Sequence, residues 1–272
     1  MKFTPHPILK APTPEEIKKL CFNEDGSDRD GGLEALIKLH EMHEDAVSNA
    51  DADPLNFGVS LEGWVYADAM LDLYDTLIIF GGNRSSKTEY GARSVVKAAL
   101  DNPNSIIVCF AQDADASVRT QQSAVYRYLP PEFKQKTKGV LEYLNYTVKN
   151  GFTGQSFILP NGSQVLFHTY SQFIANRSKF EGLELGSKSP TWHNVGLWLD
   201  EYLEDGDLVS TMRFRLVTRD AKMLLTFTPI DGFTPFVAEF LKGAETTLER
   251  KAPLLDDEMV PVTQYSPNKD AG

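Results

Sequence analysis

A lysine and a threonine end a short glycine-rich loop in this chain, directly after the apolar run at residues 76–80. Such a loop, placed between a strand and a helix, turns backbone N–H groups and the positive helix end toward an anion. The Lys87 ammonium would contact β- and γ-phosphates, and the Thr88 hydroxyl would hold Mg²⁺. We therefore predict a nucleotide-binding loop made of Gly81, Gly82, Asn83, Arg84, Ser85, Ser86, Lys87 and Thr88.

The loop departs from the usual phosphate-loop pattern at one position. Ser86 stands where that pattern has a second glycine before the lysine. Glycine there adopts positive φ without a Cβ penalty. With serine in its place, the sequence does not determine whether the loop closes tightly around a phosphate. The alternative reading is an ordinary strand–loop–helix junction capped by a hydroxyl residue.

A pair of carboxylates forms the second candidate feature. The apolar run 195–199 is followed by Asp200 and Glu201. Nucleotide hydrolysis needs one carboxylate to hold Mg²⁺ and another to orient and deprotonate the attacking water. Asp200 suits the metal role and Glu201 suits the catalytic base. The competing interpretation is a solvated acidic turn, because further acids follow at positions 204, 205 and 207.

A third strand-like run, residues 222–227, precedes Thr228 and Pro229. A threonine at such a strand end could hydrogen-bond a γ-phosphate or the attacking water and couple hydrolysis to the next segment. Ordinary turn chemistry would explain the same residues if they stood alone.

Two arginines are candidates for stabilising charge in the transition state. Arg84 lies inside the predicted loop, and Arg215 lies just before the run 222–227. Arg84 could act within its own subunit or reach a neighbouring one, whereas Arg215 could act as an arginine finger on a neighbouring subunit. A solvated helix face with charge pairs is the alternative for each.

The order of the surrounding elements predicts how these residues are positioned. Apolar runs alternate with helical segments, which indicates a mostly parallel sheet covered by helices on both faces. Its ligands should bind beyond the carboxyl ends of the strands. Helices are expected over 13–50 with a break at 25–32, and over 61–74, 89–100, 116–129 and 235–242; strands are expected over 76–80, 105–110, 156–159, 164–170, 195–199 and 222–227.

Composition limits the kinds of function. The net charge of −11 argues against nonspecific coating of nucleic acid, so any DNA contact should be local. We expect neither a secretory leader nor a membrane span, since no run of about 18 apolar residues occurs. Cys21 and Cys109 are read as reduced thiols of a cytoplasmic protein.

The three motifs, in this order, resemble the ATPase domain of the large terminase subunit of tailed bacteriophages. The resemblance runs from about Leu55 to Lys242 and depends on Gly81–Thr88, Leu197–Glu201 and Thr226–Gly232. It is most similar to members with a loop reading Gly-Gly-Asn-Arg-Ser-x-Lys-Thr-Glu.

The resemblance implies a P-loop NTPase of the additional-strand (ASCE) type that hydrolyses ATP with Mg²⁺ and moves double-stranded DNA into a procapsid. Glu201, Arg84, Arg215 and Thr228 take catalytic roles, and Thr88 and Asp200 hold the metal. A portal protein, a small terminase subunit and a homo-oligomeric ring are the implied partners, in the cytoplasm of an infected bacterium and with no membrane. Another P-loop translocase or helicase, and a non-hydrolysing assembly module, remain alternatives; a small-molecule kinase is disfavoured.

Three regions are expected. Residues 1–54 form an acidic helical appendage, residues 55–250 form the ATPase domain, and residues 251–272 form a polar tail or linker. The family carries a C-terminal nuclease domain of RNase H type, for which this chain leaves no room. Nuclease activity is therefore not expected of the chain as it stands.

Overall fold

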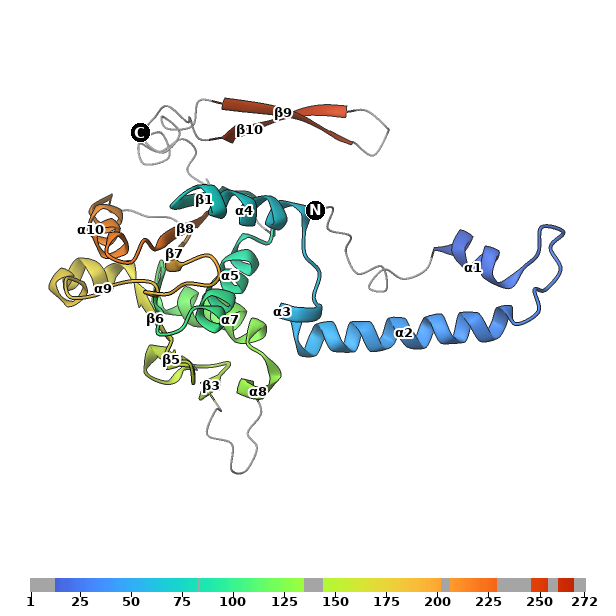
Figure 1. The fold of residues 1–272 in the computed structure, drawn as a ribbon, viewed down its shortest axis with the longest axis horizontal. Coiled ribbons are helices and arrows are strands. Elements are labelled where there is room, and N and C mark those ends of the chain that lie inside the picture. Colours follow the sequence, from blue (N-terminus) through green and yellow to red (C-terminus); the bar gives the residue numbers. More distant parts are fainter. Residues whose placement is uncertain are drawn as a thin grey trace. The chain divides into compact units, whose positions relative to one another are not determined.

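The computed structural model describes residues 13–82, 84–134, 144–201, 206–228, 246–253 and 259–266. It divides into two compact units, the first ending at Thr228 and the second beginning at Pro229. A six-stranded sheet lies at the centre of the first unit in the order β1-β8-β7-β2-β6-β5 (Figure 1). Its strands are β1 (Thr76–Phe80), β2 (Ile106–Ala111), β5 (Ser156–Ile158), β6 (Gln164–Thr169), β7 (Val195–Asp200) and β8 (Lys222–Phe227).

Neighbouring strands of this sheet pair in parallel, except that β5 runs antiparallel to β6. Every residue of β7 is buried, and so is every residue of β2 after Ile106. Continuous apolar runs of this kind suit strands that are covered on both faces. The sequence prediction of a mostly parallel α/β sheet is confirmed.

Helices cover both faces of the sheet. They are α4 (Glu62–Leu73), α5 (Lys87–Asp101), α6 (Ala114–Ala116), α7 (Ser123–Tyr128), α8 (Pro131–Lys134), α9 (Tyr170–Ala175) and α10 (Gly206–Val217). Figure 1 shows α5 and α7 on one side of the strands and α9 and α10 on the other. Side-chain alternation along β2 fits this arrangement: Cys109 joins the core cluster under α5, whereas the Phe110 ring lies 6.2 Å from that of Phe173 on α9.

The expected helix over 116–129 is instead built from three pieces, because a π-helical stretch, Ser117–Gln122, separates α6 from α7. The β5–β6 hairpin is confirmed. Two short strands, β3 (Tyr146–Thr147) and β4 (Gly151–Phe152), were not predicted.

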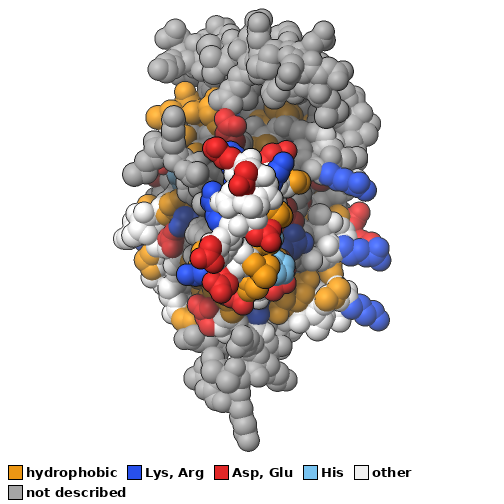
Figure 2. All heavy atoms as spheres, turned by 90° about the vertical axis from the view of Figure 1, so that its right-hand side faces the viewer, with side chains coloured by type: hydrophobic (Ala, Val, Ile, Leu, Met, Phe, Trp, Pro, Cys, Tyr) orange, Lys and Arg blue, Asp and Glu red, His pale blue; other side chains and the backbone are white. Residues whose placement is uncertain are grey.

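The acidic N-terminal region is helical, as predicted. It contains α1 (Pro14–Cys21), α2 (Gly32–Ala52) and α3 (Pro54–Phe57). The predicted boundary after residue 54 falls at the start of α3, inside the first unit. A capping box between Thr13 and Glu16 starts α1. Residues 13–53 contain 12 acidic and 4 basic side chains. Acidic side chains are prominent at the centre of Figure 2, which faces the side that these helices occupy in Figure 1.

The second unit contains strands where the sequence predicted a polar tail or linker from residue 251. Two strands, β9 (Thr246–Pro253) and β10 (Met259–Ser266), pair as an antiparallel hairpin, so β9 crosses the predicted boundary at residue 250. Backbone pairing does not require an apolar sequence, and β10 has the β-branched and aromatic residues that favour strands. The helix expected over 235–242 lies outside the described residues.

The close approach of α5 to β7 depends on Gly91. A Cβ at this position would lie closer than 3.0 Å to three atoms of the Trp198 ring, which is fully buried. We expect Gly91→Ala to lower the free energy of unfolding by about 1–3 kcal/mol, because a core this dense resists added volume. Chemical denaturation at equilibrium measures the effect.

Gly63→Ala on α4 is the matched control for Gly91→Ala. A Cβ at Gly63 meets no atom within 4 Å, so the better helix propensity of alanine should leave stability unchanged or raised by up to about 1 kcal/mol. Equal responses of the two variants would contradict the tight packing of α5 on Trp198.

Candidate active site

The loop that follows β1 continues the sheet before it turns into α5. The Gly81 N–H donates to the Phe227 carbonyl at 3.2 Å, which extends the pairing of β1 with β8. A Cβ on Gly81 would collide with the Ser85 hydroxyl, so the loop can fold tightly only with glycine there. Arg84 and Ser86 both have positive φ, at 64° and 61°. Alternation of this kind aims successive N–H groups at one point, as in backbone anion nests.

Ser86 adopts the left-handed conformation that the usual glycine would adopt. It is the residue before α5, and its side chain makes no capping hydrogen bond to the helix. The first N–H groups of α5 lack intrahelical acceptors, as at every helix start. Lys87, Thr88 and Glu89, the first residues of this helix, line a cavity. The serine therefore retains the loop geometry at a cost in backbone strain of about 1–2 kcal/mol.

Ser86→Gly should relieve this strain and raise the free energy of unfolding by about 1 kcal/mol, since glycine tolerates positive φ but gives up more entropy on folding. Thermal or denaturant unfolding measures the gain. Ser86→Ala keeps the Cβ and removes only the hydroxyl, so it should show no gain. A stabilised alanine variant would assign the effect to the hydroxyl instead of the backbone.

Lys87 is the first residue of α5 and is only 6% exposed. Its Nζ donates to the Gly81 and Gly82 carbonyls, each at 2.9 Å, and to the Ser85 hydroxyl at 3.2 Å. All three ammonium donors are therefore directed at loop oxygens. An anion bound in the loop would exchange with one of these acceptors, which gives Lys87 a short path to a phosphate oxygen.

Thr88 and Asp200 join the loop helix to the end of β7. The Thr88 hydroxyl donates to the Asp200 carboxylate, 3.3 Å from Oδ1 and 3.4 Å from Oδ2. These two residues are 112 positions apart in the chain. The meeting of Thr88 with Asp200, which the sequence predicted, is present in the structure.

The Asp200 carboxyl is 4% exposed, and burial raises its pKa to about 6. The neighbouring Glu201 charge acts in the same direction, whereas hydrogen bonds from Thr226 and Thr88 and the Lys87 charge oppose it. Thr226 donates to Asp200 Oδ1 at 2.6 Å. Because these groups do not fully offset the burial, a divalent cation beside the carboxylate would replace the missing solvation.

Glu201 leaves β7 with a φ of 62°, an uncommon value for a non-glycine residue. Its N–H donates to the Thr226 carbonyl at 2.8 Å, and its Oε1 accepts a 3.0 Å hydrogen bond from the Thr228 hydroxyl. Strained residues of this kind persist where the surrounding structure fixes them, and they concentrate at functional sites. Thr228 therefore orients the carboxylate that the sequence assigned as a base.

These side chains surround one cavity of about 240 Å³. Its lining residues come from the loop, the start of α5 and the ends of β7 and β8: Arg84, Ser85, Ser86, Lys87, Thr88, Glu89, Glu201 and Thr228. Asp200 lies beneath it, in contact with Thr88. The cavity has the position expected for ligands of parallel α/β sheets, at the carboxyl ends of the strands.

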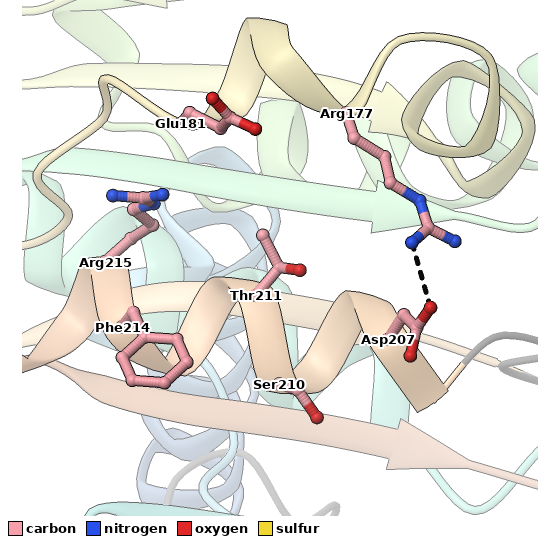
Figure 3. Close-up of a pocket in the computed structure, with 7 residues that line it drawn as sticks. All are labelled: Arg177, Glu181, Asp207, Ser210, Thr211, Phe214 and Arg215. Atoms are coloured by element: carbon pink, nitrogen blue, oxygen red, sulfur yellow. Dashed lines mark hydrogen bonds and ion pairs between the residues drawn. The ribbon is translucent and has the colours of Figure 1, made fainter.

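The remaining predicted residues fall in different places. Arg84 lines the cavity, and Asn83 lies outside the described residues. Arg215 lines a separate cavity of about 530 Å³ between α10 and the 3₁₀ helix Arg177–Phe180 (Figure 3). There it lies on the same helix as Asp207, which pairs with Arg177 at 2.9 Å. The structure thus does not bring Arg215 to the loop of its own chain.

Three buried residues support the site; the sequence placed Thr226 in the third motif and gave Trp198 and Tyr170 no role. Trp198 Nε1 donates to the Thr226 hydroxyl at 2.9 Å, and the Tyr170 hydroxyl donates to the Asp200 carbonyl at 2.9 Å. Burial raises the pKa of Tyr170, which keeps it a donor. One signal was available: an indole N–H or a threonine inside an apolar strand needs a partner, and both lie near Asp200 in the expected sheet.

The fold and the site together define a mixed α/β protein with a polar cavity at the carboxyl edge of a mostly parallel sheet. Residues 78–266 match the family of the terminase large subunit, T4likevirus-type, N-terminal. Because the match covers more than half of the 272 residues, the chain belongs to this family. A comparison with curated proteins found no match.

Membership identifies the chain as part of a terminase that packages bacteriophage DNA, with DNA and the packaging machinery as its partners in general terms. The resemblance stated from the three motifs is thereby confirmed. None of the helices that the structure describes combines the length and apolar character that a membrane span requires.

Proposed function

We propose that this chain is the ATP-hydrolysing motor domain of the terminase and couples Mg²⁺-dependent hydrolysis to translocation of double-stranded DNA into the procapsid. The observation that carries the proposal is the hydrogen bond between Thr88 and Asp200. It joins a lysine-bearing loop to a pair of carboxylates around one cavity. General nucleotide hydrolases use this combination of groups.

The strand order supports assignment to the additional-strand class of P-loop NTPases. β8 lies between β1, which leads into the loop, and β7, which ends in the carboxylates. The extra strand places Thr226 and Thr228 between the loop and the base, within reach of both carboxylates.

The residues at the site fit a magnesium ion. Thr88 and Asp200 supply the hydroxyl and carboxylate oxygens that Mg²⁺ accepts, and the nucleotide and water would complete its shell. When bound, the ion would neutralise charge on the phosphate oxygens. Lys87 and the first N–H groups of α5 would hold the phosphates themselves.

Glu201 is the proposed general base. Its carboxylate would accept a proton from water as the water oxygen attacks the γ-phosphorus, and ADP leaves with the bridging oxygen. Thr228 fixes the Glu201 carboxylate through the 3.0 Å hydrogen bond. Movement of the segment after β8 would therefore change the position of this carboxylate. That link is the proposed route from hydrolysis to DNA movement.

Two arginines are proposed to complete the site by stabilising negative charge on the γ-phosphate. Arg84 lines the cavity and would stabilise γ-phosphate charge in its own subunit. Arg215 lines the other cavity and would act only on a neighbouring subunit, in a homo-oligomeric ring on the portal. The small terminase subunit is the further proposed partner, and the host cytoplasm is the proposed location.

Steady-state phosphate release with and without double-stranded DNA tests the proposal. We expect Mg²⁺-dependent hydrolysis that DNA stimulates, and no separation of DNA strands. Strand separation would instead support a helicase. Nucleotide binding without hydrolysis in either condition would support the assembly module and contradict the motor.

A further inference from the structure

Two buried hydrogen bonds form a chain that ends on the Asp200 carboxylate. The indole Nε1 of Trp198 lies 2.9 Å from the Thr226 hydroxyl, and this hydroxyl lies 2.6 Å from Asp200 Oδ1. Trp198 and Thr226 are fully buried, and Asp200 is 4% exposed. The same carboxylate also faces Thr88 at the edge of the cavity. These hydrogen bonds therefore connect the core under α5 with the cavity beside the loop.

The direction of these bonds follows from the chemistry of the donors. An indole N–H can only donate, so the Thr226 oxygen must accept from Trp198. A hydroxyl has one proton, and Trp198 leaves it directed at Asp200. Trp198 thus sets the rotation of the Thr226 hydroxyl, and Thr226 in turn occupies one side of Oδ1. Both oxygens of the carboxylate also lie near the Thr88 hydroxyl, at 3.3 Å and 3.4 Å.

Packing fixes the start of the chain. The Trp198 ring lies against Gly91 of α5, where a Cβ would approach three ring atoms within 3.0 Å. The indole therefore cannot move toward the helix, and its N–H is held at Thr226. A rigid support of this kind preserves the orientation of a ligand group more effectively than a solvent-exposed contact.

We propose that Thr226 is a positioning residue that orients Asp200 for Mg²⁺, with Trp198 setting the direction of the Thr226 proton. This inference rests on the proposed nucleotide function. It adds two buried residues, Trp198 and Thr226, to the proposed magnesium site. Partners of metal-binding carboxylates typically change metal affinity by about 10–100-fold when they are removed. The effect should appear in the Mg²⁺ requirement and leave Mg²⁺-independent nucleotide contacts unchanged.

The test compares Thr226→Val with Thr226→Ser. Valine keeps the shape but removes the hydroxyl, whereas serine keeps the hydroxyl. Binding of a fluorescent, non-hydrolysable ATP analogue is titrated with Mg²⁺, and repeated in EDTA. We expect valine to raise the Mg²⁺ concentration at half-saturation by about 10–100-fold with unchanged affinity in EDTA, and serine to behave as wild type.

Trp198→Phe provides a second, independent measurement if the valine variant fails to fold. Phenylalanine keeps an aromatic ring but lacks the N–H, so the Thr226 proton is no longer directed, and the Mg²⁺ requirement should rise in the same direction. Trp64→Phe is the control, because Trp64 lies in the core cluster and makes no hydrogen bond to Thr226 or Asp200. An unchanged Mg²⁺ requirement in Trp198→Phe overturns the proposed role of the indole.

The outcomes separate this inference from the function on which it rests. Wild-type protein that binds the analogue without any Mg²⁺ dependence would contradict both. Mg²⁺-dependent wild-type binding with a folded Thr226→Val variant of equal Mg²⁺ requirement would overturn the positioning role alone. A serine variant as impaired as valine would also overturn it, since the hydroxyl would then not be the active feature.

Discussion

Replacing Glu201 by glutamine should reduce the rate of ATP hydrolysis by about 10²–10⁴-fold and leave nucleotide affinity near the wild-type value, because only the proton acceptor is lost. Glutamine has the same shape and can still accept the hydrogen bond that Thr228 donates to Oε1 at 3.0 Å. The phosphate contacts proposed for Lys87 and the start of α5 are unaffected. Single-turnover hydrolysis and calorimetric binding separate the two quantities.

Glu181→Gln is the matched control for Glu201→Gln. Glu181 is an exposed carboxylate that lines the cavity with Arg215, away from the phosphate loop. The same chemical change there should leave hydrolysis near wild type. If Glu201→Gln retains most of the wild-type rate, another group removes the proton, and the assignment of the base is wrong.

The sequence predicted the site because its residues lie at the ends of strongly apolar strands. Residues 195–199 and 222–227 are read as buried strands from their composition, and parallel strands bring their carboxyl ends to one edge. That reasoning placed Asp200, Glu201 and Thr228 near the loop before any distance was known. The structure places β8 beside both β1 and β7, which sequence order alone does not determine.

Side-chain hydrogen bonds were beyond the reach of the same reasoning. Whether the Thr226 hydroxyl points at Asp200 depends on a rotamer, and that rotamer is selected by the indole of Trp198. The φ angle of Ser86 is also set by the loop as a whole. The sequence therefore did not determine whether a serine in place of glycine would keep the shape of the phosphate loop. The pairing of β9 with β10 was not predicted either, because the polar and proline-containing sequence after residue 250 gives no strand pattern.

Asp200→Asn should stabilise the nucleotide-free protein in EDTA by about 3 kcal/mol at pH 7.5, although it should abolish Mg²⁺-dependent activity. The reason is burial, which raises the pKa of this carboxyl from 3.8 to about 6. A raised acid pKa means that the folded state binds the proton more tightly than the unfolded state does. Stability from this group is therefore present below pH 3.8 and lost as the pH rises through about 6.

Asparagine is neutral at every pH, so its advantage should grow between pH 4 and pH 7 and then level off. Its side-chain oxygen can still accept from Thr226, which limits the loss of hydrogen bonding. At pH 7.5 the midpoint of thermal unfolding should rise by about 6–12 °C, at about 2–4 °C per kcal/mol for a unit of this size. Thermal scans at several pH values measure the difference between the two proteins.

Asp75→Asn is the control for the loss of a surface charge. The Asp75 side chain is 80% exposed and lies 3.8 Å from Lys222, so its replacement should change stability by less than about 1 kcal/mol at any pH in this range. A gain for Asp200→Asn that does not depend on pH would mean that the buried carboxylate is not disfavoured in its charged form. The desolvation cost that a bound cation is proposed to offset would then be absent. Only the contact with Thr88 would still support a metal role for Asp200.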